Sequence, residues 1–460
     1  MISLTAGKFV DRRSIKSFLL AWLIVVEILF GSLIAARPDN SYLILGVAIG
    51  LIVVVVTFIE PVFGVYVLVT AMFVENLLRL GEISTTRLII ILTFGAWIAH
   101  ALAHKQFRVL VPLQGWLAGA FAVWGLLSAL WGIDTQKLWG ALQTMLQCIG
   151  LYLLVVNLIN SFEKVQVVVA ITVLATLALS LLALFRAITG EVVGGRVNIT
   201  QVFGTGPHAL AGYLVPGAAV LIAMLGRESQ PIRKLFLLFT LLATALAILA
   251  TGTRAAVVAL AVIAIIGITM ERRVWRVLLP GIVMGGLGAL FFLPSTSMER
   301  LGSILTTSDR GAGRLDIWLV ASNIIRSHPI LGVGLDNFGQ AFDRYLADTS
   351  GLRGIYFVQG WGSHNMFLNV QAELGIVGSV LFAAMIGMSV VSGLMAILNL
   401  KRAGDDDMGT LTLGLWLGLL GMLVVCCFLD WQYAKYLWLL LAMAEVTRRL
   451  SIRTAQSGPL

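Results

Sequence analysis

Long apolar runs recur from one end of this chain to the other, and each is the length of roughly 17 to 25 residues that a helix needs to cross a bilayer core. Hydropathy predicts candidate spans at 18–36, 41–59, 61–78, 88–103, 111–130, 139–160, 165–186, 206–225, 235–251, 254–270, 277–293, 373–398, 409–429 and 433–447. Several are short or joined almost without a loop, so some could be half-helices. We therefore expect about 12 (12–14) transmembrane helices in an all-α, polytopic membrane protein.

Composition excludes several other classes. Of 460 residues, 59% are hydrophobic and 12% are charged, far from the usage of a soluble domain. The runs do not alternate as β-barrel strands would. The cysteines (Cys148, Cys426 and Cys427) all lie in apolar runs, where they suit small core residues better than disulfides or zinc. The net charge of +9 is spread between the spans, which argues against nucleic acid as a partner.

Basic residues in the short loops predict the orientation, because such residues concentrate in cytoplasmic loops. The N-terminus has the basic start of a signal peptide, but the apolar part at 18–36 is too long, so we expect an uncleaved first helix. If the spans alternate, the cytoplasm receives the basic segments HKQFR, GRESQPIRK, ERRVWR, KRAGDDD and RRLSIR. Both termini are then cytoplasmic.

One connection is long. Residues 294–372 fall on the external side and include GRLDIWLVASNII, in which Leu315, Trp318, Leu319 and Ile325 recur at helical spacing. We expect a helical cap there rather than disorder. The chain thus divides into an N-terminal transmembrane bundle (1–293), a large periplasmic loop with amphipathic helices (294–372), and C-terminal transmembrane helices with a cytoplasmic tail (373–460).

A histidine, His364, stands in WGSHNMFLNVQAELGIVG, where this loop gives way to an apolar run. His364, Gln371, Gly375 and Gly378 fall on one face of a predicted helix, whose glycines would allow close packing. A lone histidine at a membrane rim is more often structural. Its external position alongside several arginines favours chemistry instead.

Three arginines share that external side. Arg254 opens a span after Thr251 and Thr253, two candidate caps at a helix N-terminus that favours anions. Arg314 opens the amphipathic helix, and Arg196 lies among glycines. The alternatives are an interfacial anchor for Arg254 and an ion pair with Asp316 or Asp309 for Arg314.

Together these residues suit cleavage of a lipid diphosphate. Arginines bind phosphate oxygens in fixed geometry, and a histidine with an ordinary pKa of about 6.5 can act as a base near neutrality. His208 opens another external span and could line the same cavity or belong to the core. We recognise no ligand spacing for a metal and no nucleotide-binding fingerprint, so neither metal nor ATP is expected.

Three motifs resemble the O-antigen ligase and polymerase superfamily: TGTRAA, GRLDIWLVASNIIRSHPILGVGLDNF, and the His364–Asn365 pair followed by Gly375-x-x-Gly378. The resemblance covers roughly residues 190–400. It implies a GT-C-like helical glycosyltransferase of the Gram-negative inner membrane that works at the periplasmic face in lipopolysaccharide biosynthesis.

Within the superfamily the chain most resembles the O-antigen ligases, which move O-antigen from undecaprenyl diphosphate to the lipid A core oligosaccharide. By position, the resemblance implies that His364 is the catalytic base and that Arg254 and Arg314 hold the diphosphate. Arg196 matches this set less clearly, and Asn365 and His208 are candidates for supporting roles. An O-antigen polymerase, a protein O-oligosaccharyltransferase and a lipid-linked glycan transporter remain alternatives.

Overall fold

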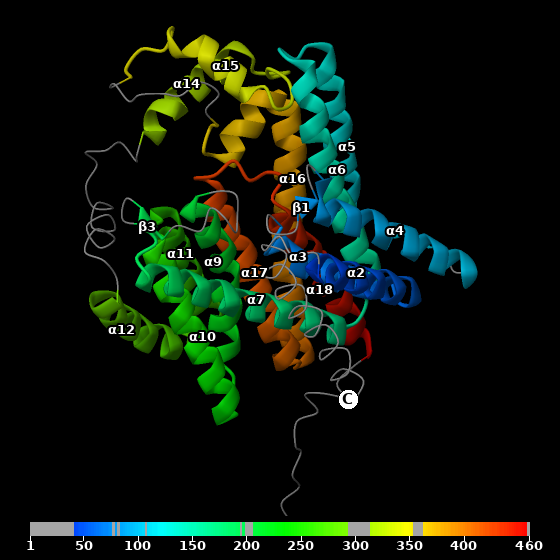
Figure 1. Cartoon of the computed structure of the whole chain (residues 1–460), viewed down its shortest axis with the longest axis vertical. Coiled ribbons are helices and arrows are strands. Elements are labelled where there is room, and N and C mark those ends of the chain that lie inside the picture. Colours follow the sequence, from blue (N-terminus) through cyan, green and yellow to red (C-terminus); the bar gives the residue numbers. More distant parts are fainter. Residues whose placement is uncertain are drawn as a thin grey trace, which may run out of the picture.

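The structure, a computed structural model, describes residues 41–75, 79–80, 83–105, 108–193, 196–197, 206–292, 313–352 and 362–457. Within these ranges the chain is almost entirely helical (Figure 1). Its strands form two short antiparallel hairpins, β1 (Arg79–Leu80) with β2 (Ile83–Ser84) and β3 (Val192–Val193) with β4 (Arg196–Val197). The predicted all-α, polytopic class is confirmed.

The helices follow the apolar runs. Before the long loop they are α2 (Ser41–Ile59), α3 (Val62–Met72), α4 (Thr85–Ala103), α5 (Leu113–Leu127) with the 3₁₀ turn η1 (Ser128–Leu130), α6 (Thr135–Leu158), α7 (Phe162–Ile188), α9 (Pro207–Leu225), α10 (Pro231–Ala250), α11 (Arg254–Met270), η2 (Arg272–Val274) and α12 (Trp275–Phe292). The rest are α14 (Arg314–Ser327), α15 (Phe338–Leu346), α16 (Met366–Ala403), α17 (Asp406–Cys426) and α18 (Lys435–Ser457).

Eight helices in the described part of the chain are long and apolar enough to cross a membrane: α4, α5 with η1, α6, α7, α9, α10, α16 and α17. Each predicted span from 41–59 onward falls on a helix, although the ends differ. The predicted first span, 18–36, lies outside the described residues. A total of about 12 spans therefore stays a prediction.

A row of small residues sets the packing at the centre of the bundle. Gly414, Gly418 and Gly421 recur along one side of α17 and face α9. A Cβ at Gly414 would lie 3.0 Å from the Val220 Cα, and one at Gly418 would lie 3.2 Å from the Pro216 Cβ. Glycine thus lets the two helix backbones approach closely, as is common between membrane helices.

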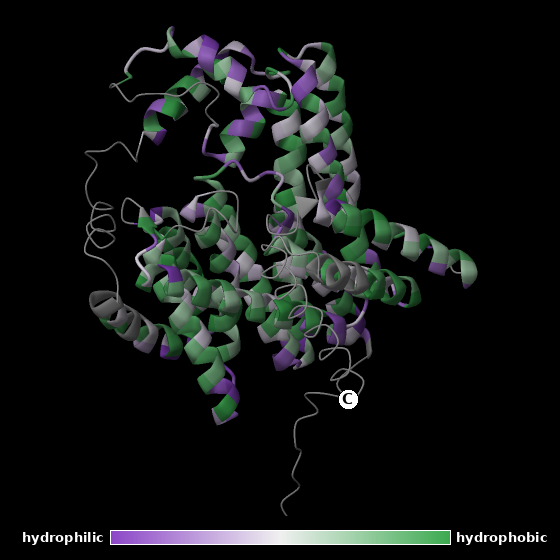
Figure 2. Cartoon of the chain, in the orientation of Figure 1, coloured by the Kyte–Doolittle hydropathy of each residue, from purple (hydrophilic) through white to green (hydrophobic). Residues whose placement is uncertain are grey.

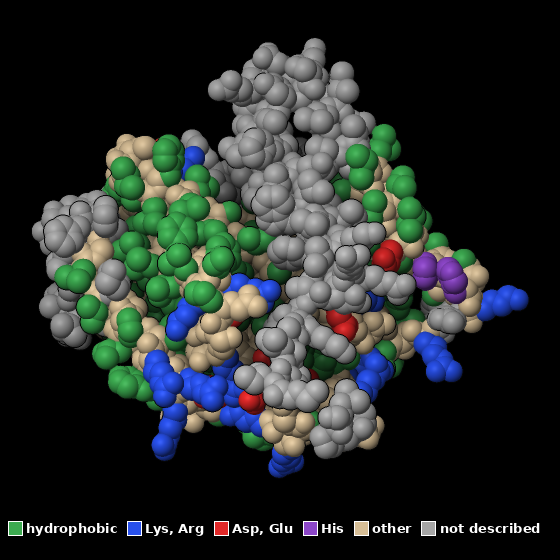
Figure 3. Space-filling view, turned by 90° about the horizontal axis from the view of Figure 1, so that it is seen from below, with side chains coloured by type: hydrophobic (Ala, Val, Ile, Leu, Met, Phe, Trp, Pro, Cys, Tyr) green, Lys and Arg blue, Asp and Glu red, His purple; other side chains and the backbone are tan. Residues whose placement is uncertain are grey.

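Ion pairs connect the loops at the end of the bundle that is predicted to be cytoplasmic. We call this end the basic end. Arg227, after α9, contacts Glu271 at 3.0 Å and Asp406 at 2.6 Å. Lys401 of α16 donates to the Met270 carbonyl oxygen at 2.7 Å. Lysine and arginine side chains gather along one edge of the face seen from below (Figure 3). The structure thus brings several of the predicted cytoplasmic loops together.

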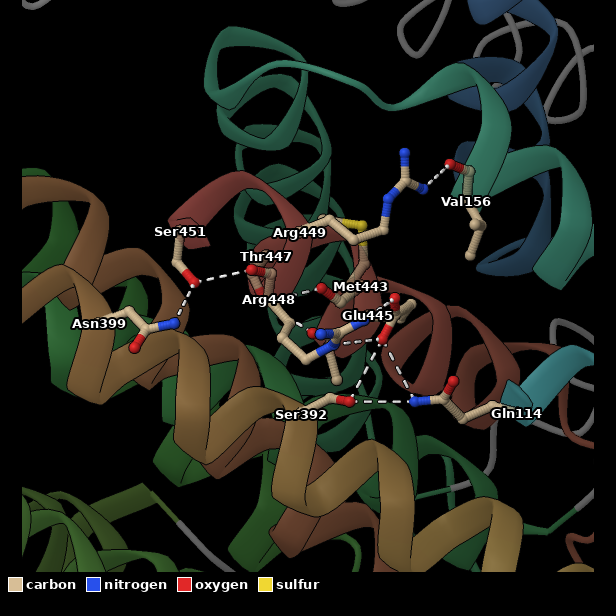
Figure 4. A network of polar contacts seen from close by, with 11 residues as sticks. Gln114, Val156, Ser392, Asn399, Met443, Glu445, Thr447, Arg448, Arg449 and Ser451 are labelled. Carbon is tan, nitrogen blue, oxygen red and sulfur yellow. Dashed lines mark hydrogen bonds and ion pairs between the residues drawn. The ribbon is translucent and has the colours of Figure 1, made fainter. Parts of the chain in front are cut away.

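A buried carboxylate ties α18 to its neighbours near the same end (Figure 4). Glu445 is 1% exposed and accepts two hydrogen bonds from Arg448, at 2.8 and 2.7 Å. Gln114 of α5 and Ser392 of α16 each donate to its Oε2 at 3.3 Å. The Glu445 carboxylate therefore connects α5, α16 and α18.

The cap consists of α14 and α15, which lie at the opposite end of the bundle in Figure 1. It has a small apolar core of its own, and its helices contain more hydrophilic residues than most helices of the bundle (Figure 2). The buried stripe of α14 is Ile317, Val320 and Ile324. Leu315 and Leu319, which marked this helix in the sequence, are 45% and 39% exposed, because the stripe that packs on α15 and α16 lies on another side.

The helix expected to carry His364, Gln371, Gly375 and Gly378 on one face is not continuous, so this prediction was wrong. His364 precedes the first residue of α16, and Gly375 interrupts the helix with φ 62° and ψ −163°. A Cβ on Gly375 would lie 2.0 Å from the carbonyl oxygen of Ile330, which only glycine avoids. Periodicity could not reveal this, because glycine is also common within membrane helices.

Residues 329–334, which connect α14 to α15 and are called the cap loop, pack into the break in α16. The N–H groups of Val333 and Gly334 donate to the carbonyl oxygens of Ala372 and Glu373, at 3.0 and 2.8 Å. Beyond the break, the N–H of Ile376 donates to the Pro329 carbonyl oxygen at 2.9 Å. Carbonyl and N–H groups released by the break are thus satisfied inside the protein, as an apolar surrounding requires. This docking fixes the cap on the bundle.

Candidate active site

His364 lies between the cap and the bundle, in the short segment that leads into α16. Its backbone is left-handed, with φ 49°, a conformation uncommon for residues with a side chain. The residues on both sides of it are held. The Trp318 indole of α14 donates to the Ser363 carbonyl oxygen at 3.1 Å, and the Asn365 side chain caps α16 by accepting from the N–H groups of Phe367 and Leu368.

Asp430, in the loop between α17 and α18, holds the same two neighbours of His364. Its Oδ1 accepts the Ser363 hydroxyl at 2.6 Å and the Asn365 N–H at 3.0 Å. Its Oδ2 lies so close to Gly362 that a Cβ at this position would be only 2.2 Å from the oxygen, so a larger residue would clash there. One carboxylate therefore fixes the segment on either side of the histidine.

Arg314 begins α14 immediately after Gly313, whose φ of 83° turns the chain into the helix. Its guanidinium carbon lies 5.8 Å from the centre of the Phe428 ring, within the range of a cation–π contact. Trp318, one turn along α14, packs on the same ring with 6.3 Å between ring centres. Phe428 thus lies against both the arginine and the indole that holds Ser363.

The electrostatic neighbours of His364 come from separate parts of the chain. Burial lowers the pKa of His364, Arg314 lowers it further, and Asp430 opposes both. The imidazole is therefore biased toward its neutral form, the form that can accept a proton. With a pKa below the ordinary histidine value of about 6.5, the imidazole is largely neutral near pH 7 and can act as a base.

His208 and Arg196 belong to the same neighbourhood. His208 lies in the first turn of α9, behind Pro207, and Arg196 lies in β4. The charges of Arg196, His364 and Arg314 all act on the imidazole of His208. Four of the predicted site residues are thus brought together from β4, α9, α14 and the segment that precedes α16.

Arg254 opens α11 at the same end of the bundle. A Cβ on Gly421 of α17 would contact both Val215 of α9 and Ile263 of α11, so these two residues lie at one level. At about 1.5 Å per residue, Arg254 lies about 13 Å above that level and His208 about 10 Å above it. Thr253 is the N-cap without a side-chain bond to the helix, and the Thr251 hydroxyl accepts the Thr253 N–H at 3.2 Å.

Further contacts hold the loop between α17 and α18 and the start of α18. Trp431 packs against Gly212 and the ring of Tyr213, which stacks on Tyr436 with 5.5 Å between ring centres. Lys435, the first residue of α18, forms a partly buried ion pair with Glu75. Glu75 also accepts the hydroxyls of Ser84 and Thr86, at 2.5 and 2.8 Å. This layer fixes the start of α18 against α9 and the β1–β2 hairpin.

Asp430, Phe428, Glu75 and Lys435 were not among the residues predicted from the sequence, and Trp318 was predicted only as part of the amphipathic helix. An acid such as Asp430 at the end of an apolar span is a functional candidate by default, so a signal existed. Asp309, offered as a partner for Arg314, lies outside the described residues. Among the residues that the structure describes, no three His, Cys, Asp or Glu side chains form a group that could hold a metal ion.

The fold and this site define a multi-pass membrane protein with a basic, histidine-containing site under a helical cap. Residues 238–383 match the family model described as O-antigen ligase. The match supports membership of the O-antigen ligase/polymerase family and confirms the resemblance seen in the sequence. It includes Arg254, Arg314 and His364, while Asp430, His208 and Arg196 lie outside it. No curated protein matches the chain.

Proposed function

We propose that the protein is an O-antigen ligase of the Gram-negative inner membrane, with its site facing the periplasm and both termini in the cytoplasm. It transfers O-antigen polysaccharide from undecaprenyl diphosphate to the lipid A core oligosaccharide, within a GT-C-like fold. The observation that carries this proposal is the meeting of His364, Arg314, His208 and Arg196 at the cap end of an apolar bundle. The family match supports the reaction class.

The geometry suggests how each residue contributes. The cap rests at one end of apolar helices, so a polyprenyl tail can lie among the spans while its diphosphate meets the arginines. Guanidinium groups bind phosphate oxygens in bidentate fashion, and they keep their charge when partly buried. Arg254 and Arg314 are the proposed primary contacts and Arg196 a further one. His208 and Asn365 support the site, Asn365 by capping the helix that follows His364.

In the proposed reaction, His364 takes the proton from a hydroxyl of the lipid A core. The oxygen attacks the anomeric carbon of the first glycan sugar and forms the new glycosidic bond. The bond from that carbon to the phosphate oxygen breaks, and undecaprenyl diphosphate leaves with the electron pair. One displacement inverts the anomeric configuration. Arginine contacts that strengthen as charge gathers on the leaving oxygen lower the barrier by several kcal/mol, the usual scale of such effects.

Reconstitution tests the reaction class. Purified protein in liposomes would receive undecaprenyl diphosphate-linked glycan and lipid A core, in EDTA and without ATP. We expect glycan on lipid A core with inverted anomeric linkage. Product that requires a divalent metal or ATP would contradict the proposed mechanism. Glycan that crosses the bilayer without changing its carrier would indicate a transporter.

The acceptor separates a ligase from its relatives. The same liposomes would be supplied with donor alone, with donor and lipid A core, and with donor and a pilin-like protein. Lengthened carrier-linked glycan in the first sample would identify a polymerase. Glycosylated protein in the third would identify a protein O-oligosaccharyltransferase. A ligase gives product only in the second.

A further inference from the structure

The loop between α17 and α18 contacts Arg314 directly and contacts both residues that flank His364. Asp430 accepts from both neighbours of His364, and two residues earlier Phe428 lies 5.8 Å from the Arg314 guanidinium carbon. The loop lies outside the segment that matches the family model. We propose that Phe428 and Asp430 are positioning residues, which hold Arg314 and His364 in place for the transfer reaction proposed above.

The backbone of His364 is strained. A left-handed conformation is unfavourable for a residue other than glycine and persists only where its surroundings hold it. Ser363 is fully buried, and its hydroxyl lies 2.6 Å from Asp430 Oδ1 and 2.8 Å from the Asn365 carbonyl oxygen. The Asn365 N–H reaches the same Oδ1 at 3.0 Å. Without Asp430, His364 loses the anchor shared by its two neighbours.

Charged and titratable groups from several elements act on His364. Among the residues that the structure describes, they are Arg314 from α14, His208 from α9 and Asp430 from the loop after α17. Among these neighbours Asp430 carries the negative charge. It therefore stabilises an imidazolium that forms when His364 takes a proton beside Arg314, without contacting the substrate.

Arg314 is held by Phe428. The guanidinium lies over the Phe428 ring, which also packs on Trp318, and the Trp318 indole donates to the Ser363 carbonyl oxygen. A planar guanidinium that packs against an aromatic face loses rotational freedom. The loop between α17 and α18 thus fixes the position of Arg314 relative to His364.

The test is the pH dependence of kcat in the reconstituted transfer reaction. Asp430→Asn keeps an oxygen that can accept both hydrogen bonds but removes the charge. The pKa of His364 should then fall, so the acid limb of the profile should move to lower pH, and kcat at pH 7 should drop several-fold. Asp430→Ala removes the hydrogen bonds as well and should lose at least tenfold more. Asp348→Asn, an exposed acid of the cap, is the control for a change of net charge and should match the wild type.

An acid limb that stays in place in Asp430→Asn overturns the role of Asp430, because a residue that only supports folding changes the amount of active enzyme and not the position of the limb. Phe428→Leu should raise KM for the donor at least fivefold, whereas Phe428→Tyr, which keeps the aromatic ring, should leave KM near the wild-type value. Wild-type kinetics in Phe428→Leu would overturn that part.

The inference rests on the proposed function, and the two can fail separately. Wild-type transfer by His364→Ala would remove the proposed base and with it the reaction mechanism. An inactive His364→Ala together with a wild-type profile for Asp430→Asn would overturn only the positioning roles.

Discussion

Trp124 donates its indole N–H to the carbonyl oxygen of Leu374 at 2.9 Å, directly beside the break in α16. A side chain of α5 thus replaces part of the helical hydrogen bonding that Gly375 removes. Together with the cap loop at residues 329–334, it encloses non-helical backbone inside the protein. The position of the cap, and of His364 beneath it, depends on this junction.

Gly375→Ala should destabilise the protein strongly. The new Cβ would meet the Ile330 carbonyl oxygen, and the backbone would be held at φ 62°. Strain of this kind costs about 1–3 kcal/mol before the clash is counted. We expect a lower Tm in detergent and loss of transfer activity. Gly387→Ala is the matched control, because it lies in the same helix and its Cβ would contact nothing within 4 Å. Equal Tm values for the two variants would contradict a structural role for the break.

Transfer activity should depend on pH through His364. Burial, together with Arg314, lowers the pKa of His364 despite the opposing charge of Asp430. A base acts in its neutral form, so kcat should be level near pH 7 and should fall as the pH drops through a pKa below the ordinary value of about 6.5. Initial rates across pH 4.5 to 8 would measure it.

His364→Ala should lower kcat by about 100-fold or more, the scale of general base catalysis, without a comparable change in donor binding. His328→Ala is the control, because His328 is exposed and contacts Tyr345 in the cap. An acid limb that persists unchanged in His364→Ala would assign the titration to another group.

Arg314→Lys should impair transfer although it keeps the positive charge. Lysine cannot present the planar fork that binds two phosphate oxygens, and its ammonium lies differently against Phe428. A tenfold loss in kcat/KM corresponds to about 1.4 kcal/mol, and we expect at least this much. Arg326→Lys, in the last turn of the same helix, is the control. Wild-type kcat/KM in Arg314→Lys would argue against bidentate contact.

Glu445→Ala should lower stability while leaving the chemistry intact. It would leave Arg448 without its carboxylate and remove the acceptor that Gln114 and Ser392 share. Loss of one partner of a buried pair costs about 3–5 kcal/mol, and less here because the Arg448 side chain is 31% exposed. Thermal unfolding in detergent measures the loss. Glu228→Ala, a basic-end acid outside this network, should unfold at the wild-type temperature; a Glu445→Ala Tm equal to it would contradict the prediction.

The class of protein and the positions of its helices could be predicted from the order of the amino acids. Apolar runs of membrane-spanning length are a local property, because a helix in lipid must satisfy its backbone hydrogen bonds within its own segment. The basic loops predicted which loops share an end, and Arg227 joins three of them. Motifs around Arg254, Arg314 and His364 were enough to indicate the family.

How the site is held depends on contacts between segments that are distant in the sequence. Asp430 lies 66 residues beyond His364, and neither the spacing nor the hydropathy of the chain shows that its carboxylate reaches Ser363 and Asn365. The break at Gly375 was equally hidden, because the partners of the freed backbone groups come from the cap loop and from α5. Local pattern fixes which segments are helices. Contacts between distant segments fix where a side chain points, and these depend on the shapes of all the surfaces that meet there.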